Sequence, residues 1–167
     1  MKKIIYILCF VLGFSAYAQN DLGKADDAAR IALAAVVSDE IDGLNPSERK
    51  YLENKLNQIT SKNGMGGAAA NERFIITANV QIVTMDITPT APPMHAYTLE
   101  VSFYIGDGIE GKLFASTSKT LKGVGETQTK AYKAALKNIK STDPVFKSFI
   151  EEGKNKIIEY YNSQCDF

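Results

Sequence analysis

The sequence predicts an α+β domain: a three-stranded antiparallel meander covered on one side by four helices. Two observations predict this class. Apolar residues recur with a helical period at both ends of the chain, whereas they alternate with polar residues between Phe74 and Leu121. The expected order of elements is helix, helix, strand, strand, strand, helix, helix. No segment repeats another, which excludes a solenoid.

The first expected helix runs from Asp21 to Asp42 and ends before Gly43. Five apolar residues recur in it at helical spacing: Ala29, Leu33, Val36, Val37 and Ile41.

The second expected helix begins sharply, with Asn45 as its N-cap, Pro46 in the first turn and Glu48 as the reciprocal cap. Its buried face is formed by Leu52, Leu56 and Ile59. The glycine-rich residues 64–67 end this helix and predict a flexible connector.

The first strand begins at Phe74, where apolar and polar residues start to alternate. After Ile82 the phase slips, because Val83, Met85 and Ile87 become the apolar positions. A β-bulge between Ile82 and Thr84 would produce such a slip. The proline-rich stretch from Thr88 to Pro93 then predicts a stiff loop.

The second strand shows the clearest alternation, with apolar side chains on one face at Tyr97, Leu99, Val101, Phe103 and Ile105. Residues Gly106 to Gly111 are expected to turn the chain. The third strand, Lys112 to Leu121, is rich in Ser and Thr, and its lysines are typical of an exposed edge.

Two further helices are expected after the sheet. The first covers Gly125 to Lys140, and the second is capped by Asp143 with Pro144 at its first position. An apolar face continues almost to Phe167 without a stop signal. Two explanations stay open: a truncated reading frame, or a frayed terminal helix.

The N-terminus has the pattern of a secretory signal peptide. Lys2 and Lys3 precede an apolar run from Ile4 to Phe14, and the small residues Ala16 and Ala18 precede Gln19. An uncleaved anchor is disfavoured, because a bilayer crossing needs about 20 apolar residues. We therefore expect a signal peptide at 1–18, a single α+β domain at 19–167, and a periplasmic or secreted location.

Cysteine usage limits the covalent chemistry of the mature chain. Cys9 lies inside the apolar run and follows Leu8, so it lacks the small preceding residue that a lipidation site needs. Once Cys9 is removed with the signal, Cys165 cannot form an internal disulfide. It is expected to be free, to pair between chains, or to pair with residues outside this sequence.

The charge balance disfavours nucleic acid as a partner. The chain has 19 basic and 19 acidic residues, and loss of Lys2 and Lys3 leaves the mature chain at −2. Phosphate binding needs clustered basic side chains. The lysines between Lys130 and Lys140 have helical spacing and predict a solvated helix face. No stretch after residue 18 is apolar enough to span a membrane.

Two groups of glycines lie at spacings or positions that occur in ligand-binding motifs. Gly106, Gly108 and Gly111 match G-x-G-x-x-G, but strands are expected on both sides, so a hairpin turn explains them better than a dinucleotide site. Gly123 and Gly125 lie between a strand and a helix. Their expected role is to permit a tight turn.

No residue is assigned a catalytic, cofactor-binding or metal-binding role. His95 is the single histidine, and nothing in the sequence positions a nucleophile beside it. One histidine and one mature-chain cysteine exclude a structural zinc site. Acidic residues on or beside the expected sheet leave a carboxylate-pair hydrolase or a calcium site open; they are Asp86, Glu100, Asp107 and Glu110.

The stretch from Arg73 to Lys140 resembles a β-β-β-α module of Gram-negative envelope proteins, of the curli secretion-channel and periplasmic flagellar-assembly types. The resemblance is carried by the strands and by the sequence GVGETQTKAYKAALKNI that starts at Gly123. It implies assembly work in the periplasm without catalysis. The leader, ending in AYAQ, also resembles those of uncharacterised secreted proteins of gut bacteria. The lipidated cysteine common in such proteins is missing here.

The leading hypothesis is an exported, non-enzymatic interaction or assembly domain of the cell envelope that holds a protein partner. The expected contact is the strand Lys112 to Leu121, with Ser116 and Ser118 on it, or the polar face of the sheet. Two alternatives remain: a hydrolase built on the four acidic residues, and a small-ligand carrier with an apolar cavity of about 300 Å3 or more.

Overall fold

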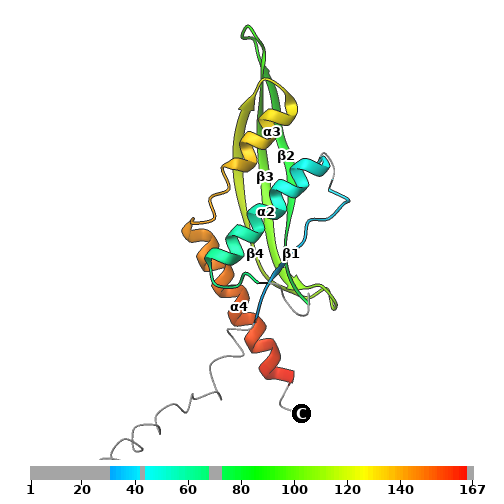
Figure 1. Ribbon diagram of the computed structural model, residues 1–167, viewed down its shortest axis with the longest axis vertical. Coiled ribbons are helices and arrows are strands. Elements are labelled where there is room, and N and C mark those ends of the chain that lie inside the picture. The colour runs from blue at the N-terminus through cyan, green and yellow to red at the C-terminus, as the bar shows by residue number, and fades with distance from the viewer. Residues whose placement is uncertain (1–30, 42–43, 68–72, 165–167) are drawn as a thin grey trace, which may run out of the picture.

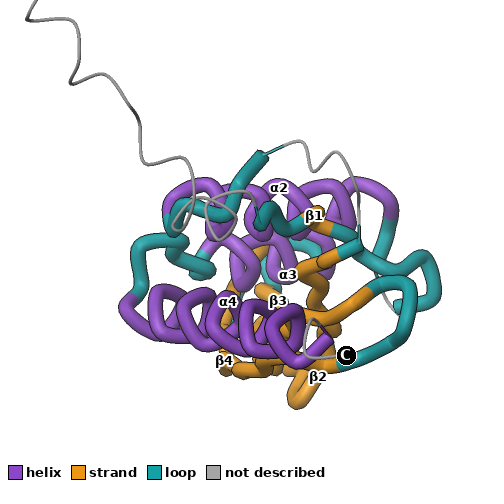
Figure 2. Tube along the Cα trace, turned by 90° about the horizontal axis from the view of Figure 1, so that it is seen from below, coloured by secondary structure: helices purple, strands orange, loops and turns teal. Residues whose placement is uncertain are grey.

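In the part of the chain that the structure describes, three helices cover one face of a four-stranded sheet (Figures 1 and 2). The computed structural model describes residues 31–41, 44–67 and 73–164. The strands follow one another across the sheet in the order β1-β2-β3-β4. In chain order the elements are β1 (Ala34–Ala35), α2 (Pro46–Lys62), β2 (Phe74–Thr88), β3 (Met94–Asp107), β4 (Leu113–Gly125), α3 (Gln128–Lys137) and α4 (Pro144–Gln164).

The α+β class and the antiparallel meander are confirmed. β3 pairs antiparallel with both β2 and β4, and the register of β2 shifts between Ile82 and Thr84, where the phase slip predicts a bulge. The expected apolar face of the second strand is buried, from Tyr97 at 5 % exposure to Ile105 at 0 %. Alternation alone was therefore sufficient to identify the core face of the sheet.

The prediction of three strands and four helices is wrong in the part of the chain that the structure describes. Within the expected helix Asp21 to Asp42, residues 31–41 contain no helix: residues 34–35 form β1, which pairs in parallel with Ile75 and Ile76 of β2, and residues 39–40 form a turn. Backbone hydrogen bonds from Leu33 to Met65 and from Val36 to Ile76 hold this segment. An unpaired sheet edge and the β-branched pair Val36 and Val37 outweigh the helical spacing.

The second expected helix is confirmed as α2. Asn45 Oδ1 accepts hydrogen bonds from the backbone amides of Ser47 and Glu48, both at 3.0 Å. The Glu48 carboxylate accepts one in return from the Asn45 amide at 3.1 Å. This reciprocal cap satisfies donors that the first turn otherwise leaves unpaired. As expected, Leu52, Leu56 and Ile59 are fully buried.

The strand and helix around Gly123 differ from the expected boundaries. β4 extends to Gly125, and α3 begins at Gln128, where Thr127 caps it. A Cβ atom at Gly123 would overlap backbone atoms of Ala131 and Ala135. Neither Gly123 nor Gly125 has a positive φ, so their expected role in a tight turn is wrong. They are needed because α3 lies almost against the backbone of β4.

The last helix, α4, completes the core. Asp143 accepts a hydrogen bond from the Val145 amide at 3.1 Å and caps the helix, as predicted. Phe146 packs edge-on against Phe103 of β3, with ring centroids 4.9 Å apart. Four apolar residues of the helix are buried: Phe146, Phe149, Ile150 and Ile157.

Three sequence predictions lie outside the described residues: the signal peptide at 1–18, the start of the first expected helix at 21–30, and the environment of Cys165. Among the helices that the structure describes, none combines the length and the apolar character that a bilayer crossing requires.

Candidate functional site

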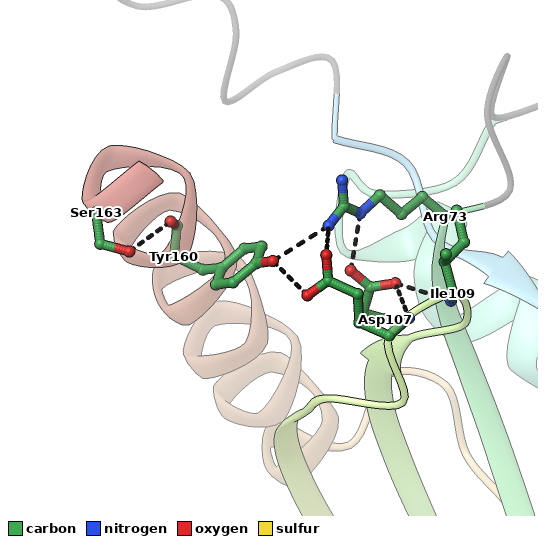
Figure 3. A network of polar contacts seen from close by, with 6 residues as sticks. Arg73, Asp107, Ile109, Tyr160 and Ser163 are labelled. Atoms are coloured by element: carbon green, nitrogen blue, oxygen red, sulfur yellow. Dashed lines mark hydrogen bonds and ion pairs between the residues drawn. The ribbon is translucent and has the colours of Figure 1, made fainter. Parts of the chain in front are cut away.

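Two of the four candidate carboxylates meet at the turn between β3 and β4, where Arg73 holds both (Figure 3). Arg73 Nε donates to Asp107 Oδ2 at 2.8 Å, and Arg73 Nη2 donates to Glu110 Oε1 at 2.9 Å. The hydroxyl of Tyr160, on α4, donates to Glu110 Oε2 at 2.5 Å. We call these four residues the hairpin joint. It fastens the last helix to the sheet.

The electrostatics of the hairpin joint oppose acid catalysis. Burial alone would raise the pKa of Asp107, which is 2 % exposed. Hydrogen bonds from the amides of Glu110 and Ile109 and from Arg73 outweigh burial and leave that pKa below its ordinary value. A general acid needs a carboxyl pKa raised toward neutrality. Asp107 and Glu110 therefore have the properties of carboxylates in structural ion pairs with Arg73.

The other two candidate carboxylates lie elsewhere on the sheet. Asp86 is exposed on β2 opposite Ala96, and Glu100 is exposed on β3 opposite Gln81. Asp86 is twelve positions along β2 from Phe74, the register partner of Asp107. At about 3.4 Å per residue, that separation is roughly 40 Å. The four acidic residues do not form one site.

His95 has no catalytic partner in the described structure. It lies on β3 between Ile87 of β2 and Gly125 of β4, and its buried Nδ1 makes no hydrogen bond. Across the described residues, no three His, Cys, Asp or Glu side chains are close enough to hold a metal ion. The G-x-G-x-x-G match lies in the β3–β4 hairpin, where Gly111 adopts a φ of +69°, as its strand context predicts.

The β4 edge, Leu113–Gly125, is where the sequence places the partner contact. Ser116, Ser118, Thr120 and Lys122 are exposed there, and so are Leu113 and Val124 near its two ends. α3 and α4 both pack on this strand. The backbone carbonyl of Lys122 already accepts a hydrogen bond from the Asn138 side chain at 2.8 Å. Between its apolar ends this edge is therefore polar, and it is flanked by helices and partly capped.

The opposite edge of the sheet is open over a longer stretch. β1 pairs with β2 only at Ile75 and Ile76, so from Thr77 to Thr88 no strand in the described chain pairs with this side of β2. Each unpaired N–H and C=O that faces outward there can bind another extended chain. We call residues 77–88 the β2 edge.

The far half of the β2 edge exposes large apolar side chains. Ile82, Val83, Met85 and Ile87 are 47–61 % exposed. Three of them are register partners of core-face positions, since Ile82 pairs with Leu99, Met85 with Tyr97 and Ile87 with His95. They remain exposed because α3 packs on β3 and β4 and leaves this part of β2 uncovered (Figure 1).

A surface hollow of about 500 Å3 adjoins the near half of the β2 edge. It opens where the segment after β1 leaves β2, and its lining includes Ser38, Glu40, Asn79, Gln81 and Tyr104. A second hollow, of about 380 Å3, lies between β4 and α4 and is lined by Ser148 and Glu152 among others. Both are open and partly polar. Neither matches the apolar cavity expected of a ligand carrier.

The sequence pattern did not predict a site at the β2 edge. Its signal was nevertheless present: between Phe74 and Thr88 the chain has no Lys or Arg, and both sides of the bulge are apolar. An edge strand normally carries charges that prevent pairing with other chains. The sequence alone does not show that most of β2 has no neighbouring strand on its outer side, because that depends on where β1 leaves β2.

No family model matches the chain, and no curated protein matches it. Similar solved structures include a minor lipoprotein from Acinetobacter baumannii, with 14 % identity, 77 % of this chain and 92 % of that chain covered, and a TM-score of 0.42. PelC from Paraburkholderia phytofirmans has 14 % identity, 75 % and 88 % coverage, and a TM-score of 0.42. A Xanthomonas campestris protein has 17 % identity, 80 % and 86 % coverage, and a TM-score of 0.41. None is described as a curli or flagellar-assembly protein.

Proposed function

We propose that this chain is an exported, non-enzymatic assembly domain of the bacterial cell envelope, and that it holds a protein partner along the β2 edge. The export step rests on the leader at residues 1–18. The docking step rests on one observation: an unpaired strand with four large apolar side chains, Ile82, Val83, Met85 and Ile87, exposed side by side.

The mode of binding that fits this edge is strand addition. An extended segment of the partner forms main-chain hydrogen bonds with the outward-facing groups of β2, and its alternate side chains enter neighbouring depressions. At the near end it meets the polar hollow beside Asn79 and Gln81. At the far end it covers the apolar residues. Burial of that apolar surface provides most of the driving force.

The β2 edge is favoured over the β4 edge for two reasons. First, the β4 edge has the exposed Lys122 along it, whereas the β2 edge has Asp86 as its single charged residue. Second, Asn138 already occupies a backbone carbonyl of β4. A solvated lysine and a filled acceptor both disfavour an added strand.

A carboxylate hydrolase is not favoured. Catalysis by two carboxyl groups requires them to face each other across a substrate site. Asp107 and Glu110 instead bind the same guanidinium, that of Arg73, and Asp107 is withdrawn from solvent.

Site-specific photo-crosslinking in the native envelope tests the proposal. A photoreactive residue at Val83 samples the β2 edge, and one at Ser118 is the matched control on the β4 edge. We expect a discrete protein adduct from Val83 and none from Ser118. An adduct from Ser118 alone would move the contact to β4. No adduct from either position, with the protein present in the envelope fraction, would refute the interaction-domain proposal.

A further inference from the structure

We infer that the strand added to the β2 edge is β2 of a second copy of this chain, so that two copies form a two-fold symmetric dimer with one continuous sheet. The inference rests on the proposed function and names the partner. It starts from the placement of the helices: α3 packs on β3 and β4, so the far half of β2 lies uncovered beside it and leads to the hairpin tip (Figure 1). Two antiparallel copies joined there keep α3 of each copy on the side of the sheet away from the shared edge.

Side-chain pairing selects the register. With Met85 on the two-fold axis, Val83 of one copy pairs with Ile87 of the other, and Asp86 pairs with Thr84. Cross-strand pairs of β-branched residues stabilise a sheet. An axis at Asp86 would set two carboxylates directly opposite each other, and an axis at Thr84 would pair Asp86 with Ile82. The Met85 register avoids both.

The charge of the edge also favours a second copy. Residues 82–88 carry one charged side chain, Asp86, and no Lys or Arg. A partner recognised by charge would find no cluster of opposite sign there, because electrostatic complementarity requires one. A second β2 edge supplies the same neutral, apolar strand. The two surfaces are therefore complementary to each other.

The number of residues in the contact sets the affinity that we expect between the two copies. A standard stable interface uses about 20–30 residues from each partner. Pairing over residues 82–88 and their immediate neighbours uses fewer. The dimer should therefore dissociate on dilution, with a dissociation constant in the micromolar range or weaker.

Sedimentation equilibrium of the mature chain, residues 19–167 with Cys165→Ser, tests the inference over a wide concentration range. We expect a reversible monomer–dimer equilibrium. Val83→Lys should raise its dissociation constant by at least about tenfold, because pairing would bury a charge against Ile87. Ser118→Lys, the matched control on β4, should leave it unchanged. Both positions are exposed, and circular dichroism checks that each variant folds.

A disulfide trap tests the register. In the same background, Met85→Cys should give a covalent dimer on mild oxidation, because residues on a two-fold axis of antiparallel strands lie about 4.5–5.5 Å apart. Ser118→Cys should not. A chain that stays monomeric at every concentration, or a dimer unaffected by Val83→Lys, would overturn the inference. If the Val83 photo-adduct nevertheless contained a different protein, the proposed function would stand and only its partner would change.

Discussion

The two long edges of this sheet differ in how they are protected. On β4 the exposed positions between Leu113 and Val124, which are exposed themselves, are Ser, Thr and Lys; α3 and α4 pack on the strand, and Asn138 occupies a carbonyl. On β2 the outer half is apolar, and β1 covers only Ile75 and Ile76. β2 and β4 each pair with β3 in the same sheet, so pairing with β3 does not explain why their outer edges differ. Edge protection on β4 and its absence on β2 are consistent with β2 as the contact strand.

The largest expected effect comes from separating α3 from β4. Gly123→Ala introduces a Cβ that overlaps backbone atoms of Ala131 and Ala135, so α3 must move away from the strand. We expect the free energy of unfolding to fall by about 2–3 kcal/mol, as for an overpacked core. Urea denaturation measures it.

The control is Gly67→Ala, where the nearest atom to an added Cβ is 3.8 Å away. It should change the free energy of unfolding by less than about 1 kcal/mol. Equal losses in the two variants would mean that close packing of α3 does not protect the β4 edge.

The next effect concerns the hairpin joint, which holds α4 beside β4. Asp107→Asn removes the buried charge that pairs with the partly exposed Arg73, and we expect a loss of about 1–2 kcal/mol of stability at pH 7. Asp86→Asn, on the exposed part of β2, should change stability by less than about 0.5 kcal/mol. Chemical denaturation of both variants provides the comparison.

The joint also predicts a pH dependence. Because the folded-state pKa of Asp107 is below its ordinary value of 3.8, the folded state binds fewer protons than the unfolded state in that range. Its contribution is fully present above pH 3.8 and is lost as the pH falls below it. The stability difference between the wild type and Asp107→Asn should therefore shrink below about pH 4. A difference that stayed constant down to pH 2 would contradict this assignment.

A smaller effect is expected from Asn138→Ala, which frees the Lys122 carbonyl on β4. Loss of one hydrogen bond should cost about 1 kcal/mol. Hydrogen exchange followed by mass spectrometry should show faster exchange in peptides from β4 and unchanged exchange in peptides from β2. Faster exchange in both strands would mean that the two edges do not respond separately.

The smallest effect on stability is expected when an exposed lysine is moved from the β4 edge to the β2 edge and an exposed valine is moved the other way. The double variant Val83→Lys with Lys122→Val changes two exposed positions and should alter the free energy of unfolding by less than about 1 kcal/mol. We expect it to be monomeric in sedimentation, because Asn138 and the helices still protect β4. Association through β4 in this variant would show that the lysines alone had protected that edge.

Local patterns predicted most of the elements. The caps at Asn45 and Asp143, the alternation from Tyr97 to Ile105 and the phase slip after Ile82 are each confirmed. The prediction was wrong at Ala34 and Ala35, because their spacing fits a helix while an open strand edge elsewhere in the chain offers hydrogen bonds to them. Gly123 was assigned the wrong role for the same reason, since Ala131 and Ala135 approach it only in the folded chain.

The sequence alone determined the class, the core face of the sheet and the starts of α2 and α4, because these depend on residues close together in the chain. Only the tertiary structure decided which strand keeps an open edge, since that depends on where β1 leaves β2 and which strands the helices cover. It also brought Arg73 to Asp107 and Glu110, and thereby placed in ion pairs with Arg73 two carboxylates that the sequence left open as catalytic. Distant segments set solvent access and charge pairing, and these properties decide what an exposed strand or a carboxylate can do.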